Sequence, residues 1–240
     1  PQGVTLNRDM EFVFNEGWKE PGVWDGEWMA ANIRRMKYVR GVVGEWKPMT
    51  SEYSIFHSGN RATTWLEPRS QKLGIAEAAA FRSAYCWDME GPFDGALMRA
   101  EPRAMAAWKA IGEYNGFLKK REDLYVGTTS VSPVAVLLSA RPRTGRGGSF
   151  TWREEDSGLY DMLAMKSVPY DIRLLTLLTP EQLGTYQGVV LPAATELAPA
   201  EMEMLRRYKA AGGKIYVLGA TEERGDLGSA ASPDAVFNSL

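Results

Sequence analysis

Short β-type runs alternate with longer amphipathic runs along the chain, and this alternation limits the possible fold more than any other feature. In the first half, the β-type runs span residues 10–15, 47–50 and 84–87. The helical runs that follow them span residues 26–41, 73–84 and 102–121, and a polar loop is predicted over residues 57–69. Repeated strand–helix units build parallel sheets, because each helix carries the chain back to the start of the next strand. The sequence therefore predicts an α/β protein.

A second alternation begins after the small polar stretch Gly127–Pro133. We predict strands at residues 134–138, 170–178, 189–191 and 214–218, and helices at residues 154–167 and 199–211. A further helix should begin at Thr179-Pro-Glu-Gln182, with Thr as N-cap and Pro in the first turn. We therefore divide the chain into a first domain over residues 1–126, a hinge over 127–133 and a doubly wound second domain over 134–240. The Gly/Arg-rich stretch 141–149 and the tail from Gly225 are predicted loops.

Composition excludes several classes of protein. The 240 residues carry a formal net charge of −2, which gives no electrostatic support for a nucleic-acid partner. No apolar run approaches the roughly 20 residues of a membrane span, so we expect a soluble protein, with the cytoplasm slightly favoured. The single cysteine, Cys86, excludes an intrachain disulfide, and the single histidine, His57, gives little support for a metal site. We expect neither a metal nor a cofactor. Because the chain begins at Pro1, we expect it to be an internal piece of a longer protein.

Acidic residues lie at or just after the ends of the three predicted strands of the first half. These residues are Glu16, Glu52 and Glu90. Functional side chains collect at the carboxyl ends of parallel strands, both in barrels and in open sheets. Glu52 stands in KPMTSEYS, where neighbouring hydroxyl groups are positioned to hydrogen-bond an ionised carboxylate. The alternative is a solvated glutamate at the end of a strand.

Two parts of the sequence resemble the family 42 β-galactosidases. The run from PVAVLLS through YDIRLLTLLTPEQLGTYQGVVLPAATELAPAEMEMLRRYKAAGGKIYVLG, roughly residues 132–220, resembles their trimerisation domain. That domain has a flavodoxin-like, class I glutamine amidotransferase-like fold. KPMTSEYS and AEAAAFRSAYCWDMEG look like the last three βα units of a glycosidase (β/α)8 barrel. The resemblance implies a retaining glycoside hydrolase with a carbohydrate substrate and a homo-oligomeric assembly, with a trimer as the specific candidate.

The resemblance also implies roles for the glutamates. Strands ending at Glu16, Glu52 and Glu90 would be the sixth, seventh and eighth of the barrel, and Glu52 would be the nucleophile. The acid/base glutamate would lie on strand four, upstream of Pro1. The pair Asn15-Glu16 is similar to the acid/base signature, but only one helix separates it from Glu52. We therefore place Glu16 on strand six as a substrate-site or structural residue and keep strand four as the alternative.

Further residues near the strand ends are candidates for substrate binding. Sugars pack their C–H faces on aromatic rings and hydrogen-bond to polar side chains, which nominates Trp18, Tyr53, His57, Trp65, Trp87, Asp88 and Glu90. For each tryptophan, packing in the core or at the rim is at least as good an interpretation.

The second domain contains neither cysteine nor histidine, so amidotransferase chemistry is not expected there. Two rival functions stay open at this point. Besides the hydrolase, the protein would be a carbohydrate-binding pseudoenzyme without a working acid, or an oligomerisation module whose barrel part is only a support.

Overall fold

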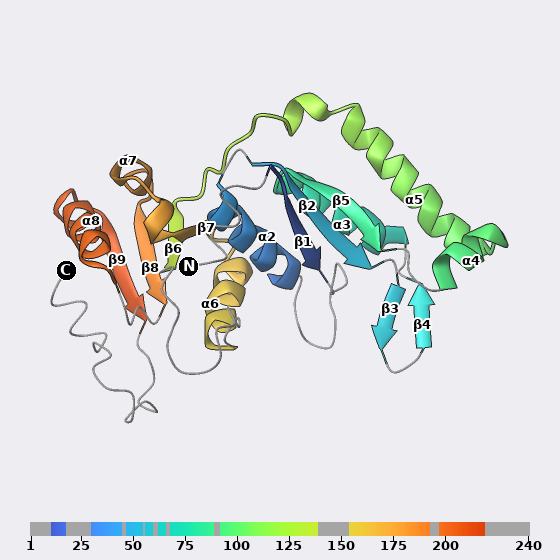
Figure 1. Ribbon diagram of the computed structural model, residues 1–240, viewed down its shortest axis with the longest axis horizontal. Helices are drawn as coiled ribbons and strands as arrows, with labels where there is room; N and C mark the ends of the chain where they lie inside the picture. Colours follow the sequence, from blue (N-terminus) through green and yellow to red (C-terminus); the bar gives the residue numbers. More distant parts are fainter. Residues whose placement is uncertain are drawn as a thin grey trace. The chain divides into compact units, whose positions relative to one another are not determined.

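The structure is a computed structural model in which the chain forms two compact units (Figure 1). The boundary falls between Thr129 and Ser130, inside the predicted hinge. Each unit contains its own parallel sheet. The structure describes residues 11–17, 30–44, 47–54, 56–59, 62–65, 68–88, 92–138, 154–192 and 197–218.

The sheet of the first unit has three parallel strands in the order of the sequence. The strands are β1 (Val13–Gly17), β2 (Met49–Ser54) and β5 (Ser83–Asp88), with β2 in the middle. Helix α2 (Ala30–Val43) joins β1 to β2, and α3 (Pro68–Ala80) precedes β5. The helices α4 (Pro92–Met98) and α5 (Pro102–Lys119) and the short 3-10 helix η1 (Glu122–Leu124) follow. The three predicted strands and the three predicted helices are thus present, with shifted ends.

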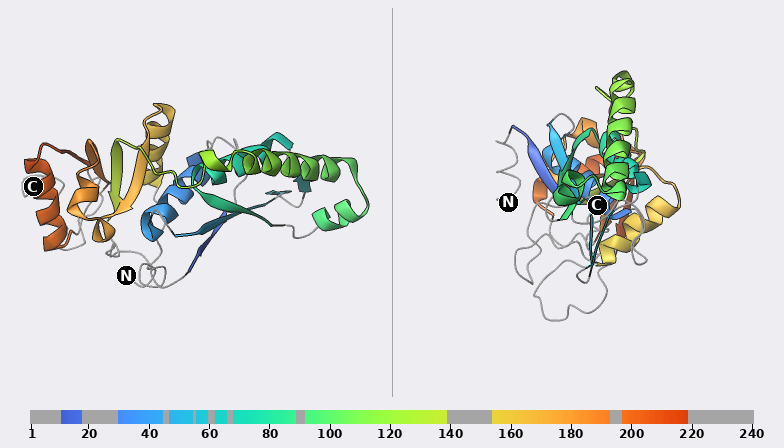
Figure 2. Two further views of the ribbon diagram at one scale, coloured as in Figure 1. Left: turned by 90° about the horizontal axis from the view of Figure 1, so that it is seen from above. Right: turned by 90° about the vertical axis from the view of Figure 1, so that its right-hand side faces the viewer.

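The helices of this unit pack against one face of the sheet. Met36 of α2 is buried against Met49 of β2, and Tyr85 of β5 packs beside both. On the same face, a second cluster joins Tyr85 and Trp87 to buried residues of α3, α4 and α5, namely Ile75, Ala96, Ala104, Ala107 and Ile111. Helix α3 lies against both β5 and α5 (Figure 2). We call this face the helix-covered face.

The opposite face is partly to largely exposed at the positions where its side chains are described, with Thr50 and Cys86 of intermediate exposure. Phe14 of β1 is 48% exposed and Phe12, two residues earlier, is 54% exposed. Ala84, the second residue of β5, is also exposed. Successive residues of a strand point to opposite faces, so these residues alternate with the buried Val13 and Ser83. We call this second face the open face.

A buried arginine ties the helix-covered side of the unit together. Arg40 of α2 is only 6% exposed. Its Nη1 donates to the carbonyl oxygens of Gly44 at 3.2 Å and Lys47 at 2.8 Å, and its Nη2 donates to those of Phe81 at 2.9 Å and Arg82 at 3.1 Å. One guanidinium therefore joins the end of α2, the approach to β2 and the turn after α3.

The predicted polar loop over residues 57–69 is wrong. Strands β3 (Phe56–Gly59) and β4 (Ala62–Trp65) form an antiparallel hairpin there, and α3 already begins at Pro68. Threonines and aromatic residues favour strands, but the hydroxyl groups and the single histidine make this segment look polar. Proline suits the first turn of a helix, which explains the earlier start of α3.

Three other predictions about helices and strands also need correction. Helix α3 ends at Ala80 rather than residue 84, and Arg82 with a φ of 55° turns the chain into β5. Helix α4 lies where no helix was predicted. In the second unit, the strand predicted over residues 170–178 ends at Leu174, because residues 175–177 form the 3-10 turn η2.

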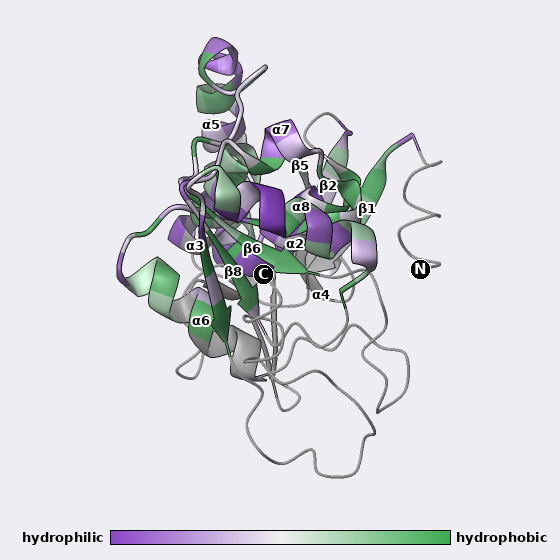
Figure 3. Cartoon of the chain, turned by 90° about the vertical axis from the view of Figure 1, so that its left-hand side faces the viewer, coloured by the Kyte–Doolittle hydropathy of each residue, from purple (hydrophilic) through white to green (hydrophobic). Residues whose placement is uncertain are grey.

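The sheet of the second unit has four parallel strands in the order β7-β6-β8-β9. These are β6 (Val134–Leu138), β7 (Tyr170–Leu174), β8 (Gly188–Pro192) and β9 (Lys214–Leu218). The connecting helices are α6 (Glu154–Met165), α7 (Pro180–Leu183) and α8 (Pro199–Ala210). The inner strands β6 and β8 are strongly hydrophobic, as their green colour in Figure 3 shows. The predicted limits of β6 and β9 match the structure.

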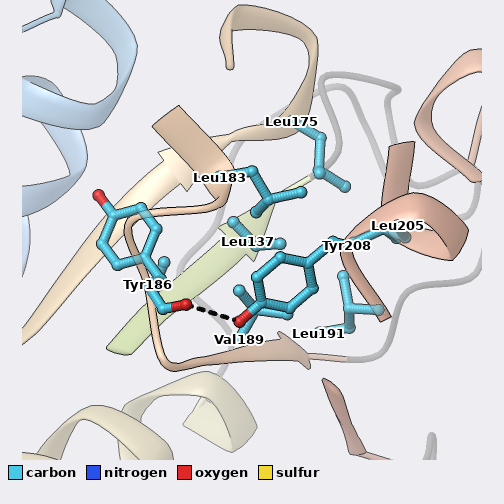
Figure 4. Close-up of a cluster of buried hydrophobic side chains, with 9 residues drawn as sticks. Leu137, Leu175, Leu183, Tyr186, Val189, Leu191, Leu205 and Tyr208 are labelled. Carbon is cyan, nitrogen blue, oxygen red and sulfur yellow. Dashed lines mark hydrogen bonds between the residues drawn. The ribbon is translucent and has the colours of Figure 1, made fainter. Parts of the chain in front are cut away.

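The core of the second unit is built around two tyrosines (Figure 4). The hydroxyl of Tyr208 donates a hydrogen bond to the carbonyl oxygen of Tyr186 at 3.0 Å. Leucine and valine side chains from β6, β8, α7 and α8 surround them, among them Leu137, Leu183, Val189, Leu191 and Leu205.

The predicted N-cap of α7 is confirmed. The backbone N–H of Gln182 donates to Thr179 Oγ1 at 3.2 Å, and the N–H of Thr179 donates to Gln182 Oε1 at 3.0 Å. These two bonds form a capping box that fixes the start of the helix. The stretch 141–149 and the tail from Gly225 lie outside the described residues. In the part of the chain that the structure describes, every helix is too short or too polar to cross a membrane.

Candidate active site at the carboxyl ends of the three parallel strands

The backbone register brings the two predicted strand-end glutamates level with each other. Glu52 of β2 pairs with Glu16 of β1 on one side and with Cys86 of β5 on the other. Neighbouring strands lie about 4.8 Å apart, so the three positions form one row across the sheet near its carboxyl end. Adjacent pairing of β1 and β2 also means that no further strand separates Asn15-Glu16 from Glu52.

The alternation along β2 assigns this row to the open face. Met49 is 2% exposed and Ser51 is 1% exposed, and Met49 packs against α2 on the helix-covered face. Position 52 is one residue further along and therefore falls on the open face. Its register partners at positions 16 and 86 fall on the same face, as do positions 54 and 88, which pair with each other. The sheet thus places Glu52 and Asp88 on one surface near the carboxyl edge.

Tyr53 and Trp87 belong to the other face. They pair with each other in the register between β2 and β5. The ring of Trp87 lies 4.7 Å from that of Tyr85 and 6.4 Å from that of Trp108 on α5, measured between ring centroids. These contacts favour the packing interpretation of Trp87, and its predicted sugar-binding role and that of Tyr53 stay predictions. Burial in this cluster raises the pKa of the Tyr85 hydroxyl well above its ordinary value of 10.0.

A pair of buried serines holds β2 and β5 together on the helix-covered side of the sheet. Ser83 Oγ lies 2.8 Å from Ser51 Oγ, to which it donates, and it also lies 3.2 Å from the carbonyl oxygen of Met49. Ser51 is the residue immediately before Glu52. The contact therefore fixes the backbone of β2 next to the candidate nucleophile. Ser51 is one of the hydroxyl residues beside Glu52 in KPMTSEYS, but it lies on the helix-covered face and bonds to Ser83.

The hairpin β3–β4 carries two more of the predicted residues. His57 lies in β3 and pairs with Thr64, and Trp65 is the last residue of β4. The hairpin follows β2 after a single residue and lies beyond the arrowhead of that strand (Figure 1). It is therefore located at the end of the sheet where Glu52 lies. Trp18 and Glu90 fall outside the described residues, and their roles stay predictions.

One residue of the row was not predicted as part of the site. Cys86 pairs with Glu52, but nothing in its local sequence marks it as functional. Cys86 is found from the register between β2 and β5. Ser51 pairs with Tyr85 on the helix-covered face, so the next pair, Glu52 with Cys86, falls on the open face. A single sequence does not provide this register.

Comparisons with known proteins support the interpretation of the fold. No protein-family model matches the chain, and no curated protein matches it. Solved structures do match. The β-galactosidase from Bacillus circulans sp. alkalophilus superposes with a TM-score of 0.69 at 15% identity, over 89% of this chain and 33% of its own. A GH42 β-galactosidase from G. stearothermophilus gives 0.62 at 14% identity, over 90% and 34%. The α-L-fucosidase isoenzyme 2 from Paenibacillus thiaminolyticus gives 0.60 at 18% identity, over 86% and 29%.

The fold is glycoside-hydrolase-like. The parallel sheets and their helices agree with a partial TIM-barrel-like arrangement as found in glycosidases. The chain spans about a third of the length of the solved structures it matches. At these identities the similarity describes the fold, so the function rests on the site itself.

Proposed function

We propose that this chain is part of a retaining glycoside hydrolase, similar to a β-galactosidase, in which Glu52 is the nucleophile. The observation that carries the proposal is the position of Glu52 near the carboxyl end of the central strand, on the open face of a sheet whose other face is covered by helices. In barrel enzymes the reacting groups lie at the carboxyl ends of the strands. The glycoside-hydrolase-like fold gives that position a chemical meaning.

The reaction proceeds in two steps. The ionised carboxylate of Glu52 attacks the anomeric carbon, and a carboxylic acid protonates the departing glycosidic oxygen. A glycosyl ester on Glu52 forms, and the same second group, now ionised, takes a proton from the water that hydrolyses this ester. The two carboxyl groups of such enzymes are about 5–5.5 Å apart. The substrate is an O-glycoside, and a β-galactoside is the specific candidate.

We assign the acid/base role to a glutamate outside this chain rather than to Glu16. In the resemblance that motivates the proposal, the nucleophile lies on strand seven and the acid/base on strand four. Strand β1 pairs directly with β2, which supports strand six for Glu16. Glu16 and Asp88 then serve as hydroxyl-binding residues beside the nucleophile.

We further propose that the second unit is a flavodoxin-like, class I glutamine amidotransferase-like domain that holds subunits together. The strand order β7-β6-β8-β9 supports this, because the first four strands of a flavodoxin-like sheet have the same relative order. Analytical ultracentrifugation of the protein that contains this chain tests the assembly. A homo-oligomer, in particular a trimer, is expected, and a monomer at micromolar concentration contradicts this part of the proposal.

The nucleophile is tested by chemical rescue in the protein that contains this chain. Glu52→Gly should abolish hydrolysis of an activated aryl β-galactoside, and added azide should restore release of the aryl group. The product of the rescued reaction should be a glycosyl azide with inverted anomeric configuration, because azide occupies the space of the lost carboxylate. Glu113→Gln is the matched control, since Glu113 is an exposed helical glutamate paired with Lys72 at 3.0 Å.

Each outcome distinguishes one interpretation from another. Full activity in Glu52→Gly removes Glu52 from the mechanism. Azide rescue in Glu16→Gly but not in Glu52→Gly moves the nucleophile to β1. A wild-type protein that binds glycosides but hydrolyses none of a broad panel is a carbohydrate-binding pseudoenzyme.

A further inference from the structure

We propose that the joint between the two units is a single residue, Thr129, and that the buried carboxylate of Asp171 keeps the joint that short. The sequence alone predicts a longer hinge over residues 127–133. The boundary between the units falls between Thr129 and Ser130. The inference is independent of the proposed function, because it uses only hydrogen bonds that lie within one unit or the other.

The chain is held to the first unit up to Thr128. Arg82 Nη1 donates to the carbonyl oxygen of Thr128, and the hydroxyl of Thr128 donates to the carbonyl oxygen of Tyr125 at 3.0 Å. The backbone of Arg82 is itself fixed, because its carbonyl oxygen accepts from the buried Arg40 at 3.1 Å. Gly127 supplies the φ of 75° at the turn after η1, a conformation that glycine adopts without strain. Thr128 is therefore still part of the first unit.

The chain is held to the second unit from Ser130 onward. Ser130 Oγ donates to Asp171 Oδ1 at 2.7 Å. Because this bond uses the hydroxyl proton of Ser130, the hydroxyl of Ser132 at 2.9 Å and its backbone N–H at 3.4 Å both donate to Ser130 Oγ. The carbonyl oxygen of Pro133 then accepts from the backbone N–H of Gln187 at 2.8 Å. Residues 130–133 thus already belong to the second unit.

Asp171 is a firm anchor because the rest of its carboxylate is fixed as well. The residue is 8% exposed. Its Oδ2 accepts from the hydroxyl of Tyr186 at 2.9 Å and from Arg173 Nη2 at 3.1 Å. Arg173 Nε also donates to the Tyr186 hydroxyl at 2.8 Å, so the three side chains hold one another in place. A hydrogen bond to an ionised acceptor is stronger than one between neutral groups, so the bond from Ser130 restrains the chain effectively.

Thr129 differs from the residues on either side of it. In the part of the chain that the structure describes, Thr129 is exposed and takes part in no hydrogen bond. Each residue contributes two soft backbone dihedral angles, and hinges between domains consist of a few residues that absorb changes in these angles. Val131 is also exposed, at 90%, but it lies between Ser130 and Ser132, which are both bound. Val131 therefore joins the hinge only when Ser130 is released.

The test measures distances between spin labels on the two units by double electron–electron resonance. The labels are attached at Asn115→Cys on α5 and Ala210→Cys on α8, two exposed positions, in the protein that contains this chain. Cys86→Ser and replacement of every other thiol prevent labelling elsewhere. The doubly labelled chain is co-expressed with an excess of the chain without cysteines, so that distances within one chain dominate. Urea unfolding of each variant checks that both units stay folded.

Three substitutions distinguish a joint of one residue from a longer one. Thr129→Gly should broaden the distance distribution, because glycine widens the range of φ and ψ at the joint. Ser130→Ala should broaden it about twofold, because the unrestrained segment grows from residue 129 to residues 129–132 and the spread of a flexible segment grows with the square root of its length. Val131→Gly is the matched control. It should leave the distribution unchanged in the wild type and broaden it further in the Ser130→Ala background.

Three results overturn the inference. If Val131→Gly alone broadens the distribution as much as Thr129→Gly does, the joint extends beyond Ser130. If Ser130→Ala leaves the distribution as it is in the wild type, the bond to Asp171 does not limit the joint. If none of the variants changes the distribution, the two units move as one rigid body and Thr129 is not a joint.

Discussion

Gly213 provides a sharp test of how the second unit is packed. It lies between the end of α8 and the start of β9, and it faces the ring of Tyr208. A Cβ atom added at this position would lie 2.3 Å from both Cε1 and Cζ of that ring and 2.5 Å from Cε2. We predict that Gly213→Ala strongly destabilises the unit, although alanine is the smallest possible addition.

The size of the effect follows from how far the ring is able to retreat. Ordinary carbon contacts begin near 3.4 Å, so the ring or the turn must shift by about 1.1 Å. Tyr208 is 7% exposed, and its hydroxyl is bound to the carbonyl oxygen of Tyr186. The backbone N–H of Gly213 is itself bound to the carbonyl oxygen of Tyr208 at 3.0 Å. With ring and turn both restrained, we expect a loss of about 3 kcal/mol in the free energy of unfolding, the upper end for overpacking.

Two other glycines serve as matched controls. Gly212 has a φ of +94° and open space around its Cβ position, so Gly212→Ala should cost only the backbone strain of about 1 kcal/mol. Gly116, inside α5, also has open space, and Gly116→Ala should stabilise its helix by about 0.5–1 kcal/mol. The three substitutions are chemically identical and are predicted to differ in sign and size.

The assay is urea unfolding combined with hydrogen exchange of peptides, from residues 188–192 and 214–218 for the two changes in the second unit and from residues 102–119 for Gly116→Ala. The double variant Gly213→Ala with Tyr208→Leu removes the ring that causes the clash, so it should cost less than the sum of the single changes by at least about 1 kcal/mol. Strict additivity, or a cost of Gly213→Ala no larger than that of Gly212→Ala, refutes the reasoning.

Three further outcomes follow from the first unit. Arg40→Met should cost about 2–4 kcal/mol in urea unfolding, because four carbonyl oxygens lose a buried charged donor, and Arg40→Lys should recover little of it. Cys86, the only thiol, should react more slowly with maleimide when a glycoside analogue is bound, since its position is in register with Glu52, and an unchanged rate contradicts that placement. Burial raises the pKa of Tyr85, so the stability that it contributes is present below pH 10 and falls as the pH rises further, because the unfolded chain ionises first. The fall in stability above pH 10 should therefore be weaker in Tyr85→Phe than in the wild type, and an equal fall in both would contradict this.

The helices and strands that are determined by residues close together in the chain were predictable from the sequence. Strand β9 begins right after Gly213 and is an uninterrupted apolar run at its centre, so its limits agree with the prediction. The start of α7 follows from Thr179 and Gln182, which satisfy each other's backbone groups without help from the rest of the fold. The location of Glu52 near the carboxyl end of a strand also needed only local information, although β2 continues to Ser54 and the strand was predicted to end at residue 50.

The arrangement of the candidate site depended on contacts between distant residues. The hairpin β3–β4 was missed because its strands stabilise each other across the turn, and neither is strongly apolar. The face to which Glu52 belongs follows from the burial of Met49 against Met36, which belongs to another element. Likewise, the pairing of Glu16 with Glu52 is a property of the sheet register.

The two units place their strand ends in different ways, and this difference argues for a site in the first. In the first unit the strands follow one another in sequence order and the helices pack on one face, so the strand-end positions of the open face gather in a single row that includes Glu16, Glu52 and Cys86. In the second unit the order reverses beside β6, and ligands of such sheets bind at the carboxyl ends of the strands next to this reversal. The strands there, β6 and β8, end in Leu138 and Pro192, and neither of these two described residues is titratable. The second unit also contains no cysteine or histidine, which supports the proposal that nucleophilic chemistry belongs to the row that contains Glu52 rather than to the second unit.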